Sequence, residues 1–445
     1  MMAATSPTFE VTIERLGYSP DSIAHLPDGK TVFIPGGVPG DTVRISIEEE
    51  RDRFSRGKIL EVLESSSNRV AKPHCPYAGI CGGCPWAFVE RAFQLEAKRA
   101  NVVDSLVRIG HMDAEQAEEL VSPIVDVGPA VGYRNKIELD VSARKGRTTI
   151  GMHAAGTSDV IKVDACPLLD SSSKKAVKAL SGALGYLSGS QDLRLERVGI
   201  RTSKRTGDTE VALWTEAGAF PRGHVAKVIS DALPVTSISR VMSKGPKAAR
   251  RIAGVEGLSG KGHWTERILD ETMHISAPSF FRVNTRGAEA LVRCVLEGLD
   301  VQDDDEAMDL YCGAGTFTLP LARRAGFVSA VESYGPAVRD LRRNLERAGI
   351  DNVDAIGGDA GLEFPDTDAD VIVVDPPRAG LAKEVVEKLS AQPARAIAYV
   401  SCDPATLARD LARFEQIGSF APTSVVPHDL FPQTFHVETV CLLSR

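Results

Sequence analysis

The chain has 445 residues, 43% of them hydrophobic and 25% charged, so it can form two to four globular domains and is neither a disordered tail nor a miniature scaffold. Its net charge of −8 argues against a protein that grips nucleic acid through an overall basic surface, although local basic grooves remain compatible with it. The sequence shows neither a secretory leader pattern nor an apolar run long enough to span a bilayer, so we expect a cytoplasmic protein.

The first seventy residues alternate short β-rich runs with turn sequences. The runs cover residues 9–16, 41–47 and 57–64, and the turn sequences LPDGK and PGGVPGD lie between the first two. Period-two alternation interrupted by Gly, Pro and Asp is typical of a small, bent antiparallel sheet. We therefore expect a compact β-barrel of the oligonucleotide-binding kind at residues 1–70, which either binds single-stranded nucleic acid or only packs on its neighbour.

A cysteine-rich segment, HCPYAGICGGCPW at residues 74–86, follows the predicted barrel. Apolar residues then recur every three or four positions through residues 89–110, which predicts one helix that ends at Gly110. From about residue 120 to 270 the pattern is mixed, with strands expected at 136–143 and 148–155 and a helix near 172–187. Residues 71–270 are therefore predicted to form a central α+β domain.

From residue 271 onward, apolar strands alternate with helical segments. The strands are expected at residues 307–312, 327–332, 353–358, 370–375 and 396–401. Near-continuous apolar strands separated by helices indicate a parallel sheet covered on both faces. The predicted fold class is therefore α/β, with a Rossmann-like, doubly wound domain at residues 271–445 that would bind ligands at the carboxyl ends of its strands.

The sequence DLYCGAGTFTL runs from the first of these strands through Gly313 and Gly315 toward a helix, and the second strand ends at Glu332. Glycines allow a tight turn close to a ligand, and an acid at the second strand end can accept hydrogen bonds from ribose hydroxyls. This order favours a cofactor that contains adenosine over a Glu332 that is only a surface acid. The third glycine of the dinucleotide fingerprint is missing, and S-adenosylmethionine, which has no pyrophosphate, suits this looser turn better than NAD.

Two further strand ends have side chains suited to chemistry. Asp375 ends an apolar strand and precedes two prolines, so we expect its carboxylate in the ligand crevice rather than in a simple Asp-Pro turn. Cys402 follows the next strand, just before a helix that begins at Pro404. A helix N-terminus favours the thiolate form of a nearby cysteine, so Cys402 is the predicted nucleophile.

The C-terminal residues PQTFHVETVCLLSR are expected to form a last strand, with His436 and Glu438 on one face. Burial of Glu438 would raise its pKa toward the range useful to a general base. A solvent-facing glutamate on an edge strand is the competing interpretation. His436 is a second candidate base, although no neighbouring residue favours it.

The sequences DLYCGAGTFTL, DPPRAG, SCDPATLARD and HVETV, in this order and spacing, closely resemble those of the S-adenosylmethionine-dependent RNA uracil-C5 methyltransferases. The resemblance extends over nearly the whole chain, since the N-terminal barrel is similar to a TRAM domain and the cysteine segment to that of the 23S rRNA branch. It implies that Cys402 is the nucleophile that adds to C6 of uracil and that Glu438 is the base that removes the C5 proton. It also implies cofactor contacts at Tyr311, Glu332 and Asp375.

Two positions depart from the family pattern. Arg282 in SFFRVN stands where the family usually has Gln, and Asp403 stands where many relatives have Asn. An arginine has a fixed charge and no hydrogen-bond acceptor, so it cannot reproduce every contact of Gln. We expect Arg282 to pair with an anion instead, either the cofactor carboxylate or an RNA phosphate.

Eight cysteines in a chain of this length are too few and too clustered for a secreted disulfide framework. Four of them share a local pattern, each being followed by Pro or Gly: Cys75, Cys81, Cys84 and Cys166. Their spacing allows either zinc or an iron–sulfur cluster, and the resemblance to the 23S rRNA branch implies a [4Fe–4S] cluster that braces the central domain. Three others are expected to pack in the core: Cys294, Cys312 and Cys441.

The sequence therefore predicts an RNA methyltransferase that makes 5-methyluridine, with 23S rRNA as the first expectation for its substrate. The same chemistry on tRNA is the alternative within the enzyme class, and an RNA-binding protein without turnover is the alternative from another class. Cys402 and Glu438 together favour an active enzyme. We expect a monomer whose affinity for RNA comes from local patches and from stacking on flipped bases.

Overall fold

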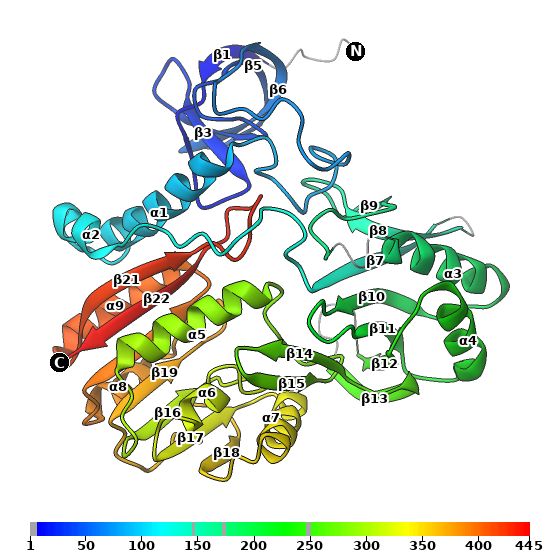
Figure 1. Ribbon diagram of the computed structural model, residues 1–445. Helices are drawn as coiled ribbons and strands as arrows, with labels where there is room; N and C mark the ends of the chain where they lie inside the picture. The colour runs from blue at the N-terminus through cyan, green and yellow to red at the C-terminus, as the bar shows by residue number, and fades with distance from the viewer. Residues whose placement is uncertain (1–6, 145–146, 171–174, 246–250) are drawn as a thin grey trace.

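The computed structural model describes residues 7–144, 147–170, 175–245 and 251–445. The described residues form three large β-sheets and one two-stranded hairpin, with the N-terminal sheet at the top of Figure 1, the central sheet at the right and the C-terminal sheet at the lower left. Across these described ranges, no helix has the length and apolar content needed to cross a membrane.

The N-terminal sheet has six strands in the order β1-β5-β6-β4-β3-β2, and their pairing is antiparallel except between β4 and β6. The strands are β1 (Thr8–Thr12), β2 (Arg15–Leu16), β3 (Asp21–His25), β4 (Thr31–Pro35), β5 (Thr42–Glu50) and β6 (Phe54–Glu64). They curl around a core that includes Val32, Ile34 and Ile45 (Figure 1). The bent sheet predicted from period-two alternation is therefore confirmed.

The central sheet has seven strands in the order β13-β12-β11-β10-β7-β8-β9. Its strands are β7 (Lys136–Arg144), β8 (Arg147–His153), β9 (Val160–Lys162), β10 (Leu195–Thr202), β11 (Thr209–Glu216), β12 (Ser237–Lys244) and β13 (Arg251–Gly260). Helices α3 (Ala176–Ser190) and α4 (Arg222–Ala232) pack their apolar residues against one face. The predicted α+β character is confirmed, although residues 172–174 of the expected helix lie outside the described residues.

The C-terminal sheet has seven strands in the order β18-β17-β16-β19-β20-β22-β21. Its strands are β16 (Glu306–Leu310), β17 (Phe327–Glu332), β18 (Val353–Gly357), β19 (Val371–Val374), β20 (Ala396–Ser401), β21 (Ala421–His428) and β22 (Glu438–Ser444). The first five are parallel, as predicted, and β22 runs antiparallel to both β20 and β21. The helices of this region are α5 (Thr285–Leu299), α6 (Thr318–Ala322), α7 (Gly335–Ala348), α8 (Lys383–Ala391) and α9 (Pro404–Ile417).

Alternating side chains of the parallel strands fill two separate cores. Val371 and Val373 face the layer that contains α5, α6 and α7, whereas Ile372 and Val374 face the layer that contains α8 and α9. All four are fully buried, so each contributes about 1.5–3 kcal/mol relative to an exposed side chain. The doubly wound arrangement follows from this burial on both faces.

The layer that contains α8 and α9, here called the second layer, also contains helices from outside residues 271–445; the layer that contains α5, α6 and α7 is called the first. Helices α1 (Arg91–Arg108) and α2 (Ala114–Leu120) place Val102, Leu106 and Ala117 in it, and α1 lies beside β21 in Figure 1. The hairpin of β14 (Trp264–Ile268) and β15 (Glu271–Ile275) joins the first layer and spans the expected boundary at residue 270. We therefore propose that residues 91–120 and the whole hairpin belong to the C-terminal packing unit.

The last strand is shorter than predicted. It begins at Glu438, and residues 432–437 form a connection in which Gln433 has a left-handed backbone with φ of 70°. The prediction that His436 and Glu438 share one face of a strand is therefore wrong. Because β22 pairs with a strand on each side, Glu438 does not lie on an edge, and the interpretation as a solvent-facing edge residue is also wrong.

Candidate active site

The turn after β16 bends sharply around its glycines. Tyr311, Gly313 and Gly315 all have positive φ, of 65°, 60° and 100°. A Cβ at Gly315 would lie 2.5 Å from Leu319 Cδ1, so only glycine fits there, whereas the space beside Gly313 is open. Both oxygens of Glu332 accept backbone N–H groups, one from Gly313 at 3.0 Å. Glu332, at the end of β17, therefore fixes the backbone of the glycine turn that follows β16.

Arg282 links two carboxylates, Asp375, which follows β19, and Glu438, which begins β22. Its Nη2 donates to both oxygens of Asp375 at 2.8 Å, and its Nη1 lies 2.7 Å from Glu438 Oε2 as an ion pair without hydrogen-bond geometry. The Arg282 and Glu438 side chains are 5% and 3% exposed, so the pairing is shielded from water. The anions expected for Arg282 were the cofactor carboxylate or an RNA phosphate, and its observed partners are instead two acids of the chain itself.

Glu438 is in an environment suited to a base. Burial raises its pKa, the charge of Asp375 raises it further, and the guanidinium of Arg282 opposes the rise. The competing candidate His436 is half-buried, and this desolvation lowers its pKa to about 4. Glu438 is therefore the stronger proton acceptor at neutral pH.

Cys402 lies just beyond the end of β20, which is between β19, the strand before Asp375, and β22, the strand that begins at Glu438. Burial raises its pKa to about 11, helped by the charges of Glu438 and Asp375 and opposed by that of Arg282. The expectation that the start of α9 favours the thiolate is therefore wrong for the free protein. The first helical N–H groups are already bound by the Asp403 side chain, which accepts from Ala405 and Thr406 at 2.9 and 3.1 Å.

Comparison with known proteins shows which family the chain belongs to. The family described as tRNA (Uracil-5-)-methyltransferase matches residues 267–360 and 358–445, and the TRAM domain matches residues 7–60. An uncharacterized RNA methyltransferase of Thermosynechococcus vestitus is 32% identical over 446 residues, which span 98% of each chain. The chain belongs to the RNA uracil-5 methyltransferase family. The predicted enzyme class is therefore confirmed.

Two further relatives span nearly all of this methyltransferase. An uncharacterized RNA methyltransferase of Gloeobacter violaceus is 34% identical over 98% of this chain and 96% of its own length. The crystal structure of the Pyrococcus abyssi tRNA (uracil-54, C5)-methyltransferase, in complex with S-adenosyl-L-homocysteine, matches 98% of this chain and 100% of its own, with a TM-score of 0.76 and 26% identity. These matches confirm the α/β fold with its N-terminal TRAM domain.

The predicted cofactor residues lie at neighbouring strand ends of the methyltransferase. Tyr311, Glu332 and Asp375 follow or end β16, β17 and β19, which are adjacent in the sheet. Burial raises the pKa of Tyr311 to about 12, so its hydroxyl is neutral at pH 7. Asp375 is committed to Arg282, and Glu332 to backbone amides, so each has its orientation fixed before a ligand binds.

The four patterned cysteines of the methyltransferase converge on one cavity, although they are separated by up to 91 positions: Cys75, Cys81, Cys84 and Cys166. Burial raises the pKa of Cys84 to about 12, the charge of Cys166 adds to the rise, and Arg134 opposes it. Among the described residues, no group of three or more His, Cys, Asp or Glu side chains is arranged to hold a single metal ion. The remaining cysteines pack as expected, with Cys312 and Cys441 buried in the two cores and Cys294 against the first.

Two contacts around Cys402 and Arg282 could not be predicted from the sequence. The hydroxyl of Tyr18, from the TRAM domain, donates to the carbonyl oxygen of Cys402 at 3.0 Å, and its ring packs edge-on against Phe435 at 5.5 Å. Residues 384 positions apart are thereby joined, and no local pattern around Tyr18 indicates this. The departure at Arg282 was visible in the sequence, but its two partners could be found only from the fold.

Proposed function

We propose that this methyltransferase transfers a methyl group from S-adenosylmethionine to C5 of a uridine in RNA, with Cys402 as nucleophile and Glu438 as base. The observation that supports the proposal most is the convergence of Asp375, Cys402 and Glu438 at the ends of three adjacent strands, β19, β20 and β22. This edge of the sheet is where doubly wound domains bind ligands.

The residues at this edge fit S-adenosylmethionine. The open space at Gly313 allows a ligand to approach the backbone, and Glu332 retains acceptor capacity for ribose hydroxyls. Tyr311 and Asp375 complete the proposed cofactor contacts. When bound, S-adenosylmethionine supplies an electrophilic methyl group, and the Pyrococcus abyssi neighbour in complex with S-adenosyl-L-homocysteine supports this choice.

The chain's own residues account for activation of the uracil and for product release. The Cys402 thiolate adds to C6, so the C5–C6 electron pair moves toward the ring carbonyl and C5 becomes nucleophilic. After methylation, Glu438 takes the C5 proton, the C5–H electron pair restores the C5–C6 double bond, and the C6–S pair returns to sulfur. The raised pKa of Glu438 suits it to accept this proton.

Arg282 supports both anionic groups in this scheme. Its guanidinium lowers the pKa of Cys402 and of Glu438 relative to what burial alone would give. The charge therefore increases the small thiolate fraction of Cys402 and favours the carboxylate form of Glu438, which can accept a proton. Arg282 in place of Gln is thus compatible with catalysis and argues against the alternative of an RNA-binding protein without turnover.

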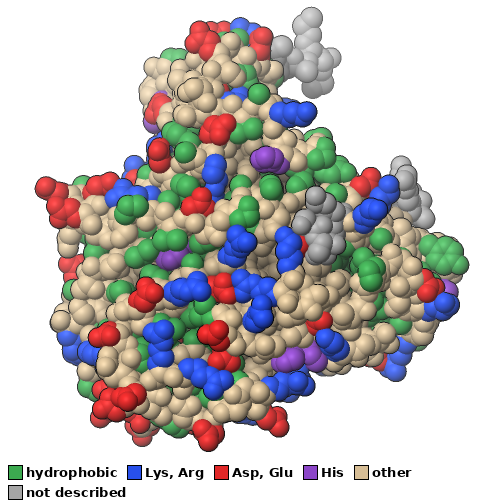
Figure 2. Space-filling model, in the orientation of Figure 1, with side chains coloured by type: hydrophobic (Ala, Val, Ile, Leu, Met, Phe, Trp, Pro, Cys, Tyr) green, Lys and Arg blue, Asp and Glu red, His purple; other side chains and the backbone are tan. Residues whose placement is uncertain are grey.

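We propose 23S rRNA as the substrate and a cytoplasmic monomer as the working form. The TRAM domain supports an RNA substrate, and the four converging cysteines support the rRNA branch that the sequence resembles. Figure 2 shows Lys and Arg side chains gathered near the middle of one face among scattered acidic ones, as expected of a chain with net charge −8 that binds RNA through local patches. A tRNA substrate is the second candidate, because the matched family and the Pyrococcus abyssi neighbour are named for tRNA.

We propose that Cys75, Cys81, Cys84 and Cys166 hold a [4Fe–4S] cluster. Four free thiols line one cavity, and burial, together with the charge of Cys166, raises the pKa of Cys75, Cys81 and Cys84, so a cationic group that binds them as thiolates would fit this site. The cluster would cross-link residues 75–84 to residue 166. Protein prepared without air should contain about four irons, and Cys166→Ser should lose most of them.

The test of the proposed function is covalent trapping. The protein is incubated with S-adenosylmethionine and 5-fluorouridine-containing rRNA fragments or tRNA, and the peptides are analysed by mass spectrometry. Fluorine at C5 cannot leave as a proton, so the adduct on Cys402 should persist. Cys402→Ser should abolish it, and Cys294→Ser, which changes a partly buried cysteine of α5, should not. An adduct with tRNA alone would replace the rRNA proposal, and no adduct with either RNA would refute the mechanism.

A further inference from the structure

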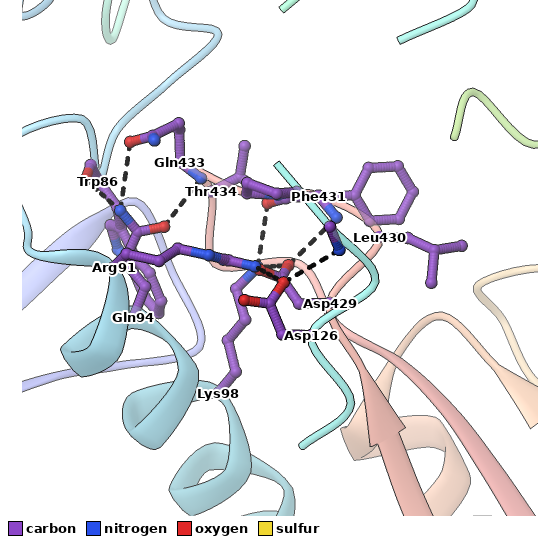
Figure 3. Close-up of polar contacts among 12 residues, drawn as sticks. Trp86, Arg91, Gln94, Lys98, Asp126, Asp429, Leu430, Phe431, Gln433 and Thr434 are labelled. Carbon is purple, nitrogen blue, oxygen red and sulfur yellow. Dashed lines mark hydrogen bonds and ion pairs between the residues drawn. The ribbon is translucent and has the colours of Figure 1, made fainter. Parts of the chain in front are cut away.

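The connection between β21 and β22, residues 429–437, is held by contacts from the opposite end of the sequence. It leads directly into Glu438, so its position determines where the base lies. Figure 3 shows Asp429 and Gln433 of this connection beside side chains of α1 and beside Trp86, which follows the last cysteine of the CGGC sequence. Two groups of contacts fix the connection, one at Asp429 and one at Gln433.

Asp429 is a fully buried carboxylate that binds two cations from α1. It accepts from Arg91 Nη1 and Lys98 Nζ, and Lys98 also donates to the carbonyl oxygen of Phe431 at 3.0 Å (Figure 3). Lys98 is itself fully buried, so neither charge can recover its solvation by rotating into water. Buried pairs of this kind restrict the number of arrangements that satisfy them, which ties the start of the connection to α1.

Gln433 ties the middle of the connection to the cysteine segment. Its N–H donates to Gln94 Oε1 at 2.9 Å, and its carbonyl oxygen accepts from the N–H of Trp86 at 3.1 Å. Gln94 Nε2 in turn donates to the carbonyl oxygens of Trp86 and Val89 at 3.2 and 2.8 Å. The left-handed backbone of Gln433 is unfavourable for a residue with a Cβ, so these contacts hold it in a conformation that it would otherwise leave.

The same residue reaches the cysteine cavity. Gln433 lines that cavity beside Cys84, and Trp86 is two positions beyond Cys84 in the chain. A displacement of the cysteine segment would therefore be transmitted to Gln433 and, five residues later, to Glu438. The expectation that the cluster braces the central domain did not include this second contact with the C-terminal domain.

We propose that Gln94 is a positioning residue for Glu438, acting through Gln433, and that the cysteine segment and α1 together set the position of the base. The proposal rests on the proposed function. Glu438 acts only after methylation, when the C5–H bond breaks, its proton moves to the carboxylate and the C6–S bond gives its electron pair back to Cys402. Displacing Glu438 therefore slows release and leaves attack by Cys402 largely unchanged.

The experiment compares Gln94→Leu with the wild type in single-turnover reactions on uridine-containing RNA. Leucine matches the size of glutamine and removes all of its hydrogen bonds. Gln116→Leu is the matched control, because Gln116 is exposed on α2. Reactions are quenched at intervals, and the covalent protein–RNA species and the methylated free RNA are quantified on denaturing gels. Thermal unfolding of each protein checks that it is folded.

We expect Gln94→Leu to form the covalent species at close to the wild-type rate and to release RNA about tenfold more slowly, so that the species accumulates. Gln94→Glu keeps an acceptor for the Gln433 N–H and should release RNA faster than Gln94→Leu, and it provides the comparison if Gln94→Leu does not fold. Equal slowing of both steps, or unchanged release, would overturn the positioning role. Failure of the wild type to form an adduct with 5-fluorouridine RNA would instead overturn the proposed function.

Discussion

Replacing Arg282 with Gln tests whether the buried guanidinium stabilises the folded protein by pairing with the two acids of the site. The guanidinium binds Asp375 through two hydrogen bonds of 2.8 Å and lies 2.7 Å from Glu438. Glutamine is shorter and neutral, so neither carboxylate would retain a cationic partner. It is also the residue that the resemblance leads one to expect at this position.

The loss of stability can be worked out from the burial of these groups. Removing one partner of a buried ion pair costs about 3–5 kcal/mol, because the remaining charge stays desolvated. At about 2–4 °C per kcal/mol for a domain of 150–250 residues, the unfolding midpoint should fall by about 6–20 °C near pH 8. Burial raises the pKa of Asp375 and Glu438, and without Arg282 both pKa values rise further. A folded-state acid with a raised pKa destabilises the fold increasingly as pH rises, so the deficit should be smaller at pH 5.

Thermal unfolding of wild type and Arg282→Gln at pH 5 and pH 8 measures this difference. Arg44→Gln is the matched control, since Arg44 also pairs with two acids, Glu10 and Glu61, but on the surface. Water already screens those charges, so we expect a much smaller change there. The reasoning is refuted if Arg282→Gln and Arg44→Gln lower the midpoint equally, or if the effect of Arg282→Gln is the same at both pH values.

Two further predictions follow from buried titratable groups. Burial and the charges of Glu438 and Asp375 raise the pKa of Cys402 to about 11. The rate of adduct formation with 5-fluorouridine RNA should therefore rise nearly tenfold per pH unit between pH 7 and 10. A rate that is already constant at pH 7 would contradict this prediction. Burial raises the pKa of Asp309 to about 8, the charges of Asp375 and Glu332 add to the rise, and a hydrogen bond of 2.6 Å from Thr318 opposes it. The folded protein therefore holds a proton on Asp309 that the unfolded chain releases. The free energy of unfolding should fall as pH rises from about 4 to 8. The asparagine of Asp309→Asn does not ionise. The unfolding midpoint of this variant, measured relative to the wild type, should therefore be higher at pH 8 than at pH 5. An equal difference at both pH values would count against a raised pKa of Asp309.

The parallel sheet could be predicted because its strands are apolar on both faces. In Val371–Val374 every side chain is buried, which local sequence shows directly as an uninterrupted apolar run. The order of Gly313, Glu332, Asp375 and Cys402 along the chain then placed them at one edge of the sheet, because parallel strands share the direction of their carboxyl ends. The position of Cys402 before a helix predicted a nucleophile there, and the resemblance to a known family added the uracil chemistry that we propose for Cys402 and Glu438.

Features that depend on distant contacts could not be predicted in the same way. The residues TFHV before Glu438 have a strand-like pattern, but Gln433 is held in a left-handed conformation by Gln94, which is 339 positions away. The pKa of Cys402 was misjudged for a related reason, since its burial and the nearby acids come from several strands. Local propensity cannot include partners that only the fold brings together.

The hydrogen bond from Tyr18 to the carbonyl oxygen of Cys402 limits how this enzyme can be re-engineered. TRAM domains look like interchangeable modules, and exchanging one is an obvious way to redirect an enzyme to a new transcript. Here such a graft would also remove a donor from the backbone of Cys402, the proposed nucleophile, and an aromatic neighbour from Phe435. A working chimera must therefore bring a tyrosine of its own to this position, so recognition and chemistry have to be transplanted together.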